Sequence, residues 1–295
     1  MLCIALDRQL YKTTLVYYYA GSPTVVHVIP GGKEVGGVTS LGDDVFVVHM
    51  NSQQKIKVYD AKTFTLQRHI PVPGLGDRCW GLAASPYNNC LYASDFDNAS
   101  IHRVDLSGSN SVMKRWSVAG WPHGLSVNSE HNLIVVSGEG KLQIFTTQGT
   151  LLQDIQLQAD IGGPWHAVQL PTTGQFLVSH GDIGELHRVC LVGIDGAVVR
   201  NYGGQAGSEL KQVNWPNGLA VDREKRVLVA DCHNDRLLVL DQSLSSAHEM
   251  SVSVNGGLKG PRSLWYDQSR RRLYIGESSG KRVIVIDNLK DFRVN

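Results

Sequence analysis

The sequence contains one unit that recurs six times, and this repeat limits the folds open to the chain. Each unit contains short β-branched runs such as Leu133-Ile134-Val135-Val136, bounded by Gly, Asn, Asp and Ser. The units lie 43 to 51 residues apart and align on a two-residue step, here called the Gly-Leu step: Gly37-Val38, Gly81-Leu82, Gly124-Leu125, Ala167-Val168, Gly218-Leu219 and Ser263-Leu264. Repeats of this length with three or four strands each predict radially arranged four-stranded antiparallel sheets rather than a helical array.

No linker or low-complexity stretch separates the units, so we expect a single all-β domain over residues 1–295. The last unit ends near Asp287 after only three strands. A closed ring leaves no open sheet edge. We therefore predict that an N-terminal strand, Thr24 to Ile29, completes the last sheet.

Composition narrows the class of protein. Hydrophobic residues make up 42% of the chain and charged residues 19%, which is typical of a folded domain rather than a disordered one. The net charge of +1 gives no overall basic field, so RNA binding is disfavoured. No run of 18 apolar residues occurs, and no membrane span is expected.

The five cysteines are scattered and form no CxxC motif. Cys79 and Cys90 lie too far apart along a predicted hairpin for a disulfide, so we expect buried thiols. With no convincing signal peptide at the N-terminus, a cytoplasmic or nuclear location is predicted.

One copy of the unit carries a recognisable motif. Trp215-Pro216-Asn217-Gly218-Leu219-Ala220-Val221-Asp222, followed by Val229-Ala230-Asp231-Cys232-His233-Asn234-Asp235-Arg236-Leu237, resembles the NHL repeat, which reads P-x-G-L-A-V-D and then V-A-D-x-x-N-x-R. The match is partial in the units at Trp80 and Trp121 and weaker in the others. The resemblance covers about residues 34–287 and implies a six-bladed β-propeller. Such propellers include ubiquitin-ligase substrate-binding domains, RNA binders, peptide-amidating lyases and, more distantly, lactonases, so fold alone does not fix function.

Two sets of positions recur in the aligned units. The residue before each Gly-Leu step forms what we call the inner ring: Gly36, Trp80, His123, His166, Asn217 and Arg262. The last residue of each second strand forms the outer ring: His49, Asp95, Ser137, His180, Asp231 and Glu277. Because the second strand runs antiparallel beside the first, we expect both rings on the same face of the molecule.

The inner ring is polar and aromatic, which favours a ligand-binding site at the channel mouth. The predicted binding residues are Trp80, His123, His166, Asn217 and Arg262, together with His180 and Glu277 of the outer ring. Arg262 has two interpretations, a bidentate contact to a ligand carboxylate or phosphate, or a salt bridge to Glu277 or Asp231. Asp95 and Asp231 are expected to accept backbone N–H bonds in the following turn.

A divalent metal, zinc or calcium, is the alternative at this mouth. Metal-dependent propellers of similar fold place ligands at the inner position, and Pro122-His123-Gly124-Leu125 is similar to a metal-binding segment of the amidating lyases. His123 and His166 would be the ligands, with Asn217 matching a lactonase ligand in part. A catalytic zinc usually takes three protein ligands, so this set is thin. The other interpretation is a pair of hydrogen-bonded histidines at a wet channel mouth.

The leading functional prediction is a non-enzymatic recognition module that binds a protein, a peptide or a small ligand and needs no cofactor. A metal-dependent lyase or hydrolase using His123 and His166 is the second possibility. An RNA-binding propeller is the third, weakened by the balanced charge.

Overall fold

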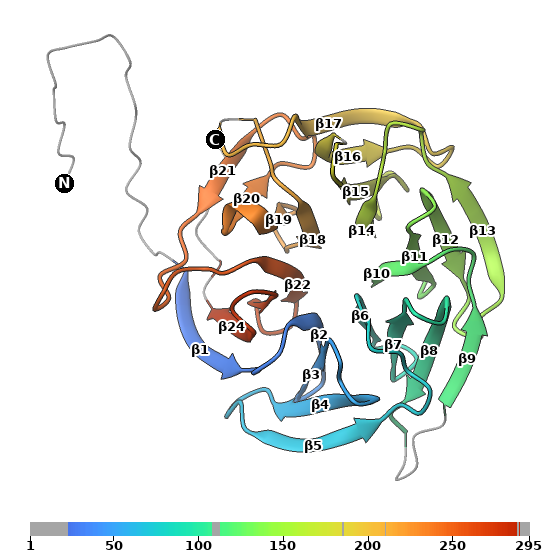
Figure 1. Ribbon diagram of the computed structural model, residues 1–295, viewed down its shortest axis with the longest axis vertical. Helices are drawn as coiled ribbons and strands as arrows, with labels where there is room; N and C mark the ends of the chain where they lie inside the picture. Colours follow the sequence, from blue (N-terminus) through green and yellow to red (C-terminus); the bar gives the residue numbers. More distant parts are fainter. Residues whose placement is uncertain (1–22, 108–112, 185, 210, 288, 290–295) are drawn as a thin grey trace, which may run out of the picture.

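The strands form six four-stranded antiparallel sheets arranged around a central axis, as the view along that axis shows (Figure 1). This computed structural model describes residues 23–107, 113–184, 186–209, 211–287 and 289. The prediction of an all-β, six-bladed propeller is confirmed. Each Gly-Leu step of the sequence lies in or just before the first strand of a blade.

The blades follow one another in sequence order, each with its first strand innermost (Figure 1). Blades 1 to 3 consist of β2 (Val35–Leu41), β3 (Asp44–His49), β4 (Lys55–Asp60) and β5 (Leu66–Pro71); β6 (Leu82–Ser85), β7 (Cys90–Asp95), β8 (Ser100–Asp105) and β9 (Met113–Ser117); and β10 (Pro122–Val127), β11 (Leu133–Ser137), β12 (Lys141–Phe145) and β13 (Leu151–Gln156). Blades 4 to 6 consist of β14 (Pro164–Gln169), β15 (Phe176–His180), β16 (His187–Val192) and β17 (Val198–Gly204); β18 (Pro216–Val221), β19 (Val227–Asp231), β20 (Arg236–Leu240) and β21 (Ala247–Met250); and β22 (Pro261–Asp267), β23 (Arg272–Glu277), β24 (Arg282–Asp287) and β1 (Thr24–Pro30).

The ring is closed by the first described strand. β1 pairs antiparallel with β24, from Thr24 opposite Asp287 to Pro30 opposite Arg282. The predicted N-terminal closing strand is therefore confirmed, one residue longer than expected. Blade 6 thus takes three strands from the end of the described chain and one from its beginning, as the blue strand beside the red ones shows (Figure 1).

The core is divided among the blade interfaces. Six clusters of buried side chains occur among the described residues, and each joins two neighbouring blades. The second strands are buried along their whole length, as in β11 and β19. Strands covered on both faces read as continuous apolar runs, which explains the β-branched runs of the sequence.

The Gly-Leu step reflects a close approach between neighbouring inner strands. A Cβ atom on Gly81 would lie 2.6 Å from the carbonyl oxygen of His123, and one on Gly218 would lie 2.4 Å from that of Arg262. A Cβ is not tolerated at such distances, so glycine is required at these two positions, whereas blades 4 and 6 have Ala167 and Ser263 at the aligned position.

The outer ring belongs mainly to the internal bonding of the blades. Asp231 accepts a hydrogen bond from the Nε of Arg236 at 2.8 Å, and Glu277 accepts one from the Nε of Arg282 at 2.6 Å. His180 accepts one from the Nε of Arg188 at 3.1 Å. In each case a residue near the start of the third strand holds the end of the second.

The two outer-ring aspartates accept backbone N–H groups, but from different directions. Asp95 accepts from Asn98 in the following turn, as predicted. Asp231 instead accepts from Asn214, which precedes its blade, at 2.7 Å.

The described cysteines, Cys79, Cys90, Cys190 and Cys232, are buried free thiols, as expected. Within the described ranges, no helix has the length and apolar character needed to cross a membrane.

Truncating a buried side chain of the closing strand tests how much this strand contributes to stability. Ile29 is 1% exposed and packs with Val35, Val283 and Val285, whereas Val26 on the same strand is 41% exposed. Ile29→Ala should lower the free energy of unfolding by about 2 to 5 kcal/mol because it leaves a cavity. Val26→Ala, the control, should change it by less than about 0.5 kcal/mol. Equal effects in urea titrations would contradict closure by β1.

The histidine at the end of β15 should make stability depend on pH. Burial, reinforced by Arg188 beside it, lowers the pKa of His180 from 6.5 to about 4. Between these values the unfolded chain binds a proton that the folded protein does not. The stabilisation is therefore complete above about pH 6.5 and is lost as the pH falls toward 4, by up to about 3 kcal/mol.

His180→Gln should flatten this pH dependence of the unfolding free energy. Measurement at pH 8 gives the baseline cost of the substitution, because His180 is neutral there in both states. A variant whose stability falls between pH 6.5 and 4 as steeply as that of the unchanged protein would show that His180 titrates normally.

Candidate functional site

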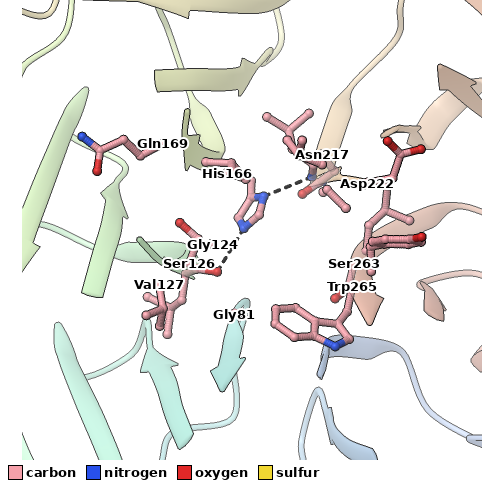
Figure 2. A pocket seen from close by; sticks show the side chains of 18 of the residues that line it. Gly81, Gly124, Ser126, Val127, His166, Gln169, Asn217, Asp222, Ser263 and Trp265 are labelled. Atoms are coloured by element: carbon pink, nitrogen blue, oxygen red, sulfur yellow. Dashed lines mark hydrogen bonds between the residues drawn. The ribbon is translucent and has the colours of Figure 1, made fainter. Parts of the chain in front are cut away.

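A cavity of about 460 Å³ follows the inner strands of blades 2 to 6. Figure 2 shows its lining side chains converging from different blades. Its walls are mostly apolar and include Leu125, Val168, Leu219, Leu264 and Trp265. Blade 1 contributes no lining residue, because Trp265 reaches across from β22 and donates a hydrogen bond from its indole to the Oγ of Ser40 at 2.8 Å.

One end of the cavity, here called the ring end, is formed by inner-ring residues. Four of the predicted residues, Trp80, His166, Asn217 and Arg262, line it. Asn217 is buried, and the other three are largely covered. The pairing of first and second strands is irregular at this position in five blades. Such bulges redirect a side chain.

The other end, here called the turn end, is lined by residues of the turns that follow the inner strands. Thr172, Lys225 and Gln268 lie there and are exposed. The cavity therefore opens on the face opposite the two rings. Sequence reasoning named only the starts of the inner strands and missed these residues. Counting five to seven residues from the first residue of each Gly-Leu step would have found them.

His166 is held by hydrogen bonds on both sides of its ring. The backbone N–H of Leu219 donates to its Nδ1 at 3.0 Å, and its Nε2 lies 3.0 Å from the carbonyl oxygen of Leu125 (Figure 2). Because a backbone N–H must donate, Nδ1 is the acceptor and Nε2 carries the proton. Burial lowers the pKa of His166, which favours this neutral form. His166 thus links blades 3, 4 and 5.

His123 does not line the cavity. Its Nδ1 lies 2.7 Å from the carbonyl oxygen of Pro164, to which it donates, and its ring stacks on Trp165 with centroids 4.7 Å apart. Burial lowers the pKa of His123 as well.

The two inner-ring histidines do not fit a zinc or calcium site as they are arranged. Both nitrogens of His166 are engaged by backbone groups. No group of three or more His, Cys, Asp or Glu that could hold a metal occurs within the described residues. A metal at His123 and His166 stays a prediction, and no chemical step is derived from it.

Arg262 is partly buried and pairs with a residue that the sequence did not suggest. Its guanidinium lies 3.6 Å over the ring of Trp80, and its Nη1 donates to Glu34. The predicted alternative, a salt bridge to Glu277 or Asp231, is wrong, because Arg282 and Arg236 of the same blades already bind those carboxylates. Burial lowers the pKa of Arg262, and Glu34 opposes the shift.

An aromatic layer covers the ring end. Trp165 lies at its centre and contacts Trp80, His123 and Trp215, with ring centroids 4.7 to 6.4 Å apart. Trp121, 56% exposed, stacks on Phe96 at the edge of the layer. This layer separates the cavity from the face that carries the two rings.

Two of the predicted site residues lie away from the cavity. His180 and Glu277 are buried within their blades and bind Arg188 and Arg282. The structure thus brings Trp80, His166, Asn217 and Arg262 together and leaves His123, His180 and Glu277 outside the cavity lining.

Three solved structures share this architecture at low sequence identity, which shows the fold alone. The hydrazine synthase of Kuenenia stuttgartiensis is 15% identical, with a TM-score of 0.65, covering 92% of this chain and 99% of that one. Virginiamycin B lyase from Staphylococcus aureus is 11% identical, with a TM-score of 0.62, covering 86% and 80%. A protein of unknown function from Bacteroides caccae is 16% identical, with a TM-score of 0.60, covering 79% and 82%.

No curated protein matches the sequence. The family model of the NHL repeat matches residues 213–240, which span β18 to β20 of blade 5. The chain is therefore a six-bladed β-propeller in which one blade matches the NHL repeat.

Proposed function

We propose that the propeller is a binding module whose central cavity takes a small, mostly apolar ligand through the turn end. The observation that carries this proposal is the cavity itself, about 460 Å³ and lined mainly by apolar side chains. Small-molecule sites typically measure about 300 to 1,000 Å³ and combine apolar walls with a few polar groups.

The polar groups gather at the two ends of the cavity. Arg262, Asn217 and the indole of Trp80 lie at the ring end, and Lys225 lies at the turn end. A ligand between them would contact Val168 and Trp265 along its length. This arrangement favours a small molecule over a folded partner, because its contacts lie along the axis rather than on an outer surface.

Binding is favoured over catalysis by the state of the titratable groups in the cavity. His166 is fixed by two backbone hydrogen bonds. Asp222 accepts from the backbone N–H of Arg226 at 2.8 Å and from its Nε at 2.6 Å. Neither side chain is free to act as a general base on a ligand.

Filling the cavity should abolish binding of an apolar probe. Val168 lines the cavity and is partly accessible, so Val168→Trp should block it. With 8-anilinonaphthalene-1-sulfonate as the probe, we expect bright fluorescence with the unchanged protein and a loss of affinity of at least about tenfold in Val168→Trp.

Val199→Trp is the matched control, because Val199 is 52% exposed on the outer strand β17. This variant should bind the probe normally. If both variants bind it alike, the probe lies elsewhere, for example on the exposed aromatic layer, and the proposal fails.

A further inference from the structure

The ring end of the cavity has more hydrogen-bond donors than acceptors. If the cavity binds a small ligand, as proposed above, an excess of donors favours a ligand group that accepts hydrogen bonds. The available donors belong to Arg262 and Asn217, and both side chains line the cavity.

Arg262 holds most of the unused donors. A guanidinium has five N–H groups, and among the described residues one of them is hydrogen-bonded, to Glu34. The face of the guanidinium is covered by Trp80 at 3.6 Å, so its remaining donors point outward in the plane of the group. A guanidinium stacked in this way is fixed in orientation and binds carboxylates through its edge.

Trp80 supplies the aromatic face that orients the guanidinium, not a donor to the ligand. Its indole Nε1 is fully buried and has no hydrogen-bond partner in the described part of the chain, so it is closed to a ligand in the cavity. Asn217 can supply its side-chain amide, since no hydrogen bond from another described residue engages that group.

His166 adds no acceptor, because both of its nitrogens are already used. The ring end therefore suits a group that only accepts hydrogen bonds. An ionised acid is such a group.

The shape of the cavity adds a second constraint. Its lining along β22 and the following turn runs from Arg262 to Gln268, six residues, or about 20 Å at strand rise. A volume of about 460 Å³ spread over that length describes a narrow passage rather than a round chamber. Its walls between the ends are apolar, at Leu125, Val168 and Leu264.

We propose that the ligand is an elongated monocarboxylate with its acid group at Arg262 and its apolar chain extending toward the turn end. The carboxylate would bind the edge of the guanidinium that Glu34 leaves open. Burial strengthens this contact, because the Arg262 side chain is 12% exposed and charges interact more strongly away from water.

Glu34 limits the affinity for such an acid. Its carboxylate competes for the same guanidinium, but its side chain is 33% exposed and water can solvate it when the ligand arrives. Removing the charge of Glu34 should therefore strengthen the binding of an acid. Removing the charge of Arg262 should have the opposite effect and weaken the binding of an acid.

Lys225 is the other cation in the lining. It is exposed at the turn end. An exposed ammonium contributes little to an ion pair, so we place the acid at Arg262. Lys225→Gln tests whether the acid lies at the turn end instead.

The test compares decanoate with decan-1-ol by isothermal titration calorimetry, on the full chain, below the concentrations at which either aggregates. Decanoate should bind at least about tenfold more tightly than decan-1-ol, as expected for hydrogen bonds to a charged group. Arg262→Gln should remove this preference without weakening the alcohol. Glu34→Gln should raise decanoate affinity by about threefold or more. Arg200→Gln, the control on the exposed outer strand β17, should leave both affinities within about twofold.

Each other outcome overturns part of the argument. Equal affinities for acid and alcohol would leave the cavity as a binding site but sink the assignment of the acid. A preference that survives Arg262→Gln and disappears in Lys225→Gln would place the acid at the turn end. If Arg262→Gln does not fold, a decanoate affinity that fails to rise in Glu34→Gln decides against the proposal. If neither compound binds while the anilinonaphthalene probe still does, the elongated ligand is wrong. If the probe also fails, the proposed function falls with it.

Discussion

The close approach of neighbouring inner strands around the axis is the constraint on which the rest of the molecule depends. Where one strand faces the next, a Cβ at Gly81 or Gly218 would lie within 2.6 Å of a carbonyl oxygen. The glycine therefore sets how near the axis six blades can lie. The residue before it stands at the ring end, and the apolar residue after it packs between blades. One small residue per repeat thus fixes the position of both the cavity lining and the core.

The fold was predictable because its signal is repeated. Six Gly-Leu steps and six buried second strands reinforce one another, and the missing strand of blade 6 identified Thr24 to Ile29 as its closure, one residue short of the observed β1. The site was predictable only in part. Position in the repeat correctly placed Trp80, His166, Asn217 and Arg262 around one cavity. The partner of Arg262 was not predictable. Glu34 is 228 residues away in sequence and does not occupy the outer-ring position of the repeat, where Glu277 and Asp231 lie.

His166 shows how a residue type can suggest chemistry while performing a structural task. A histidine at an inner position of a propeller resembles a metal ligand when only the sequence is known. In the structure it donates to Leu125 and accepts from Leu219, and so bridges strands of three blades. No sequence pattern distinguishes these two roles, because both need a neutral imidazole at the same place. The hydrogen bonds of the ring favour the structural role.

The absence of blade 1 from the cavity lining has a consequence for recognition. Trp265 reaches from blade 6 to Ser40 and covers that side of the axis, so the passage is bounded by five blades rather than six. A ring of similar blades would present nearly the same surroundings in six rotational settings. This tryptophan removes that degeneracy and gives the passage one distinct wall. A bound molecule would consequently meet one preferred rotational setting about the axis rather than six equivalent ones.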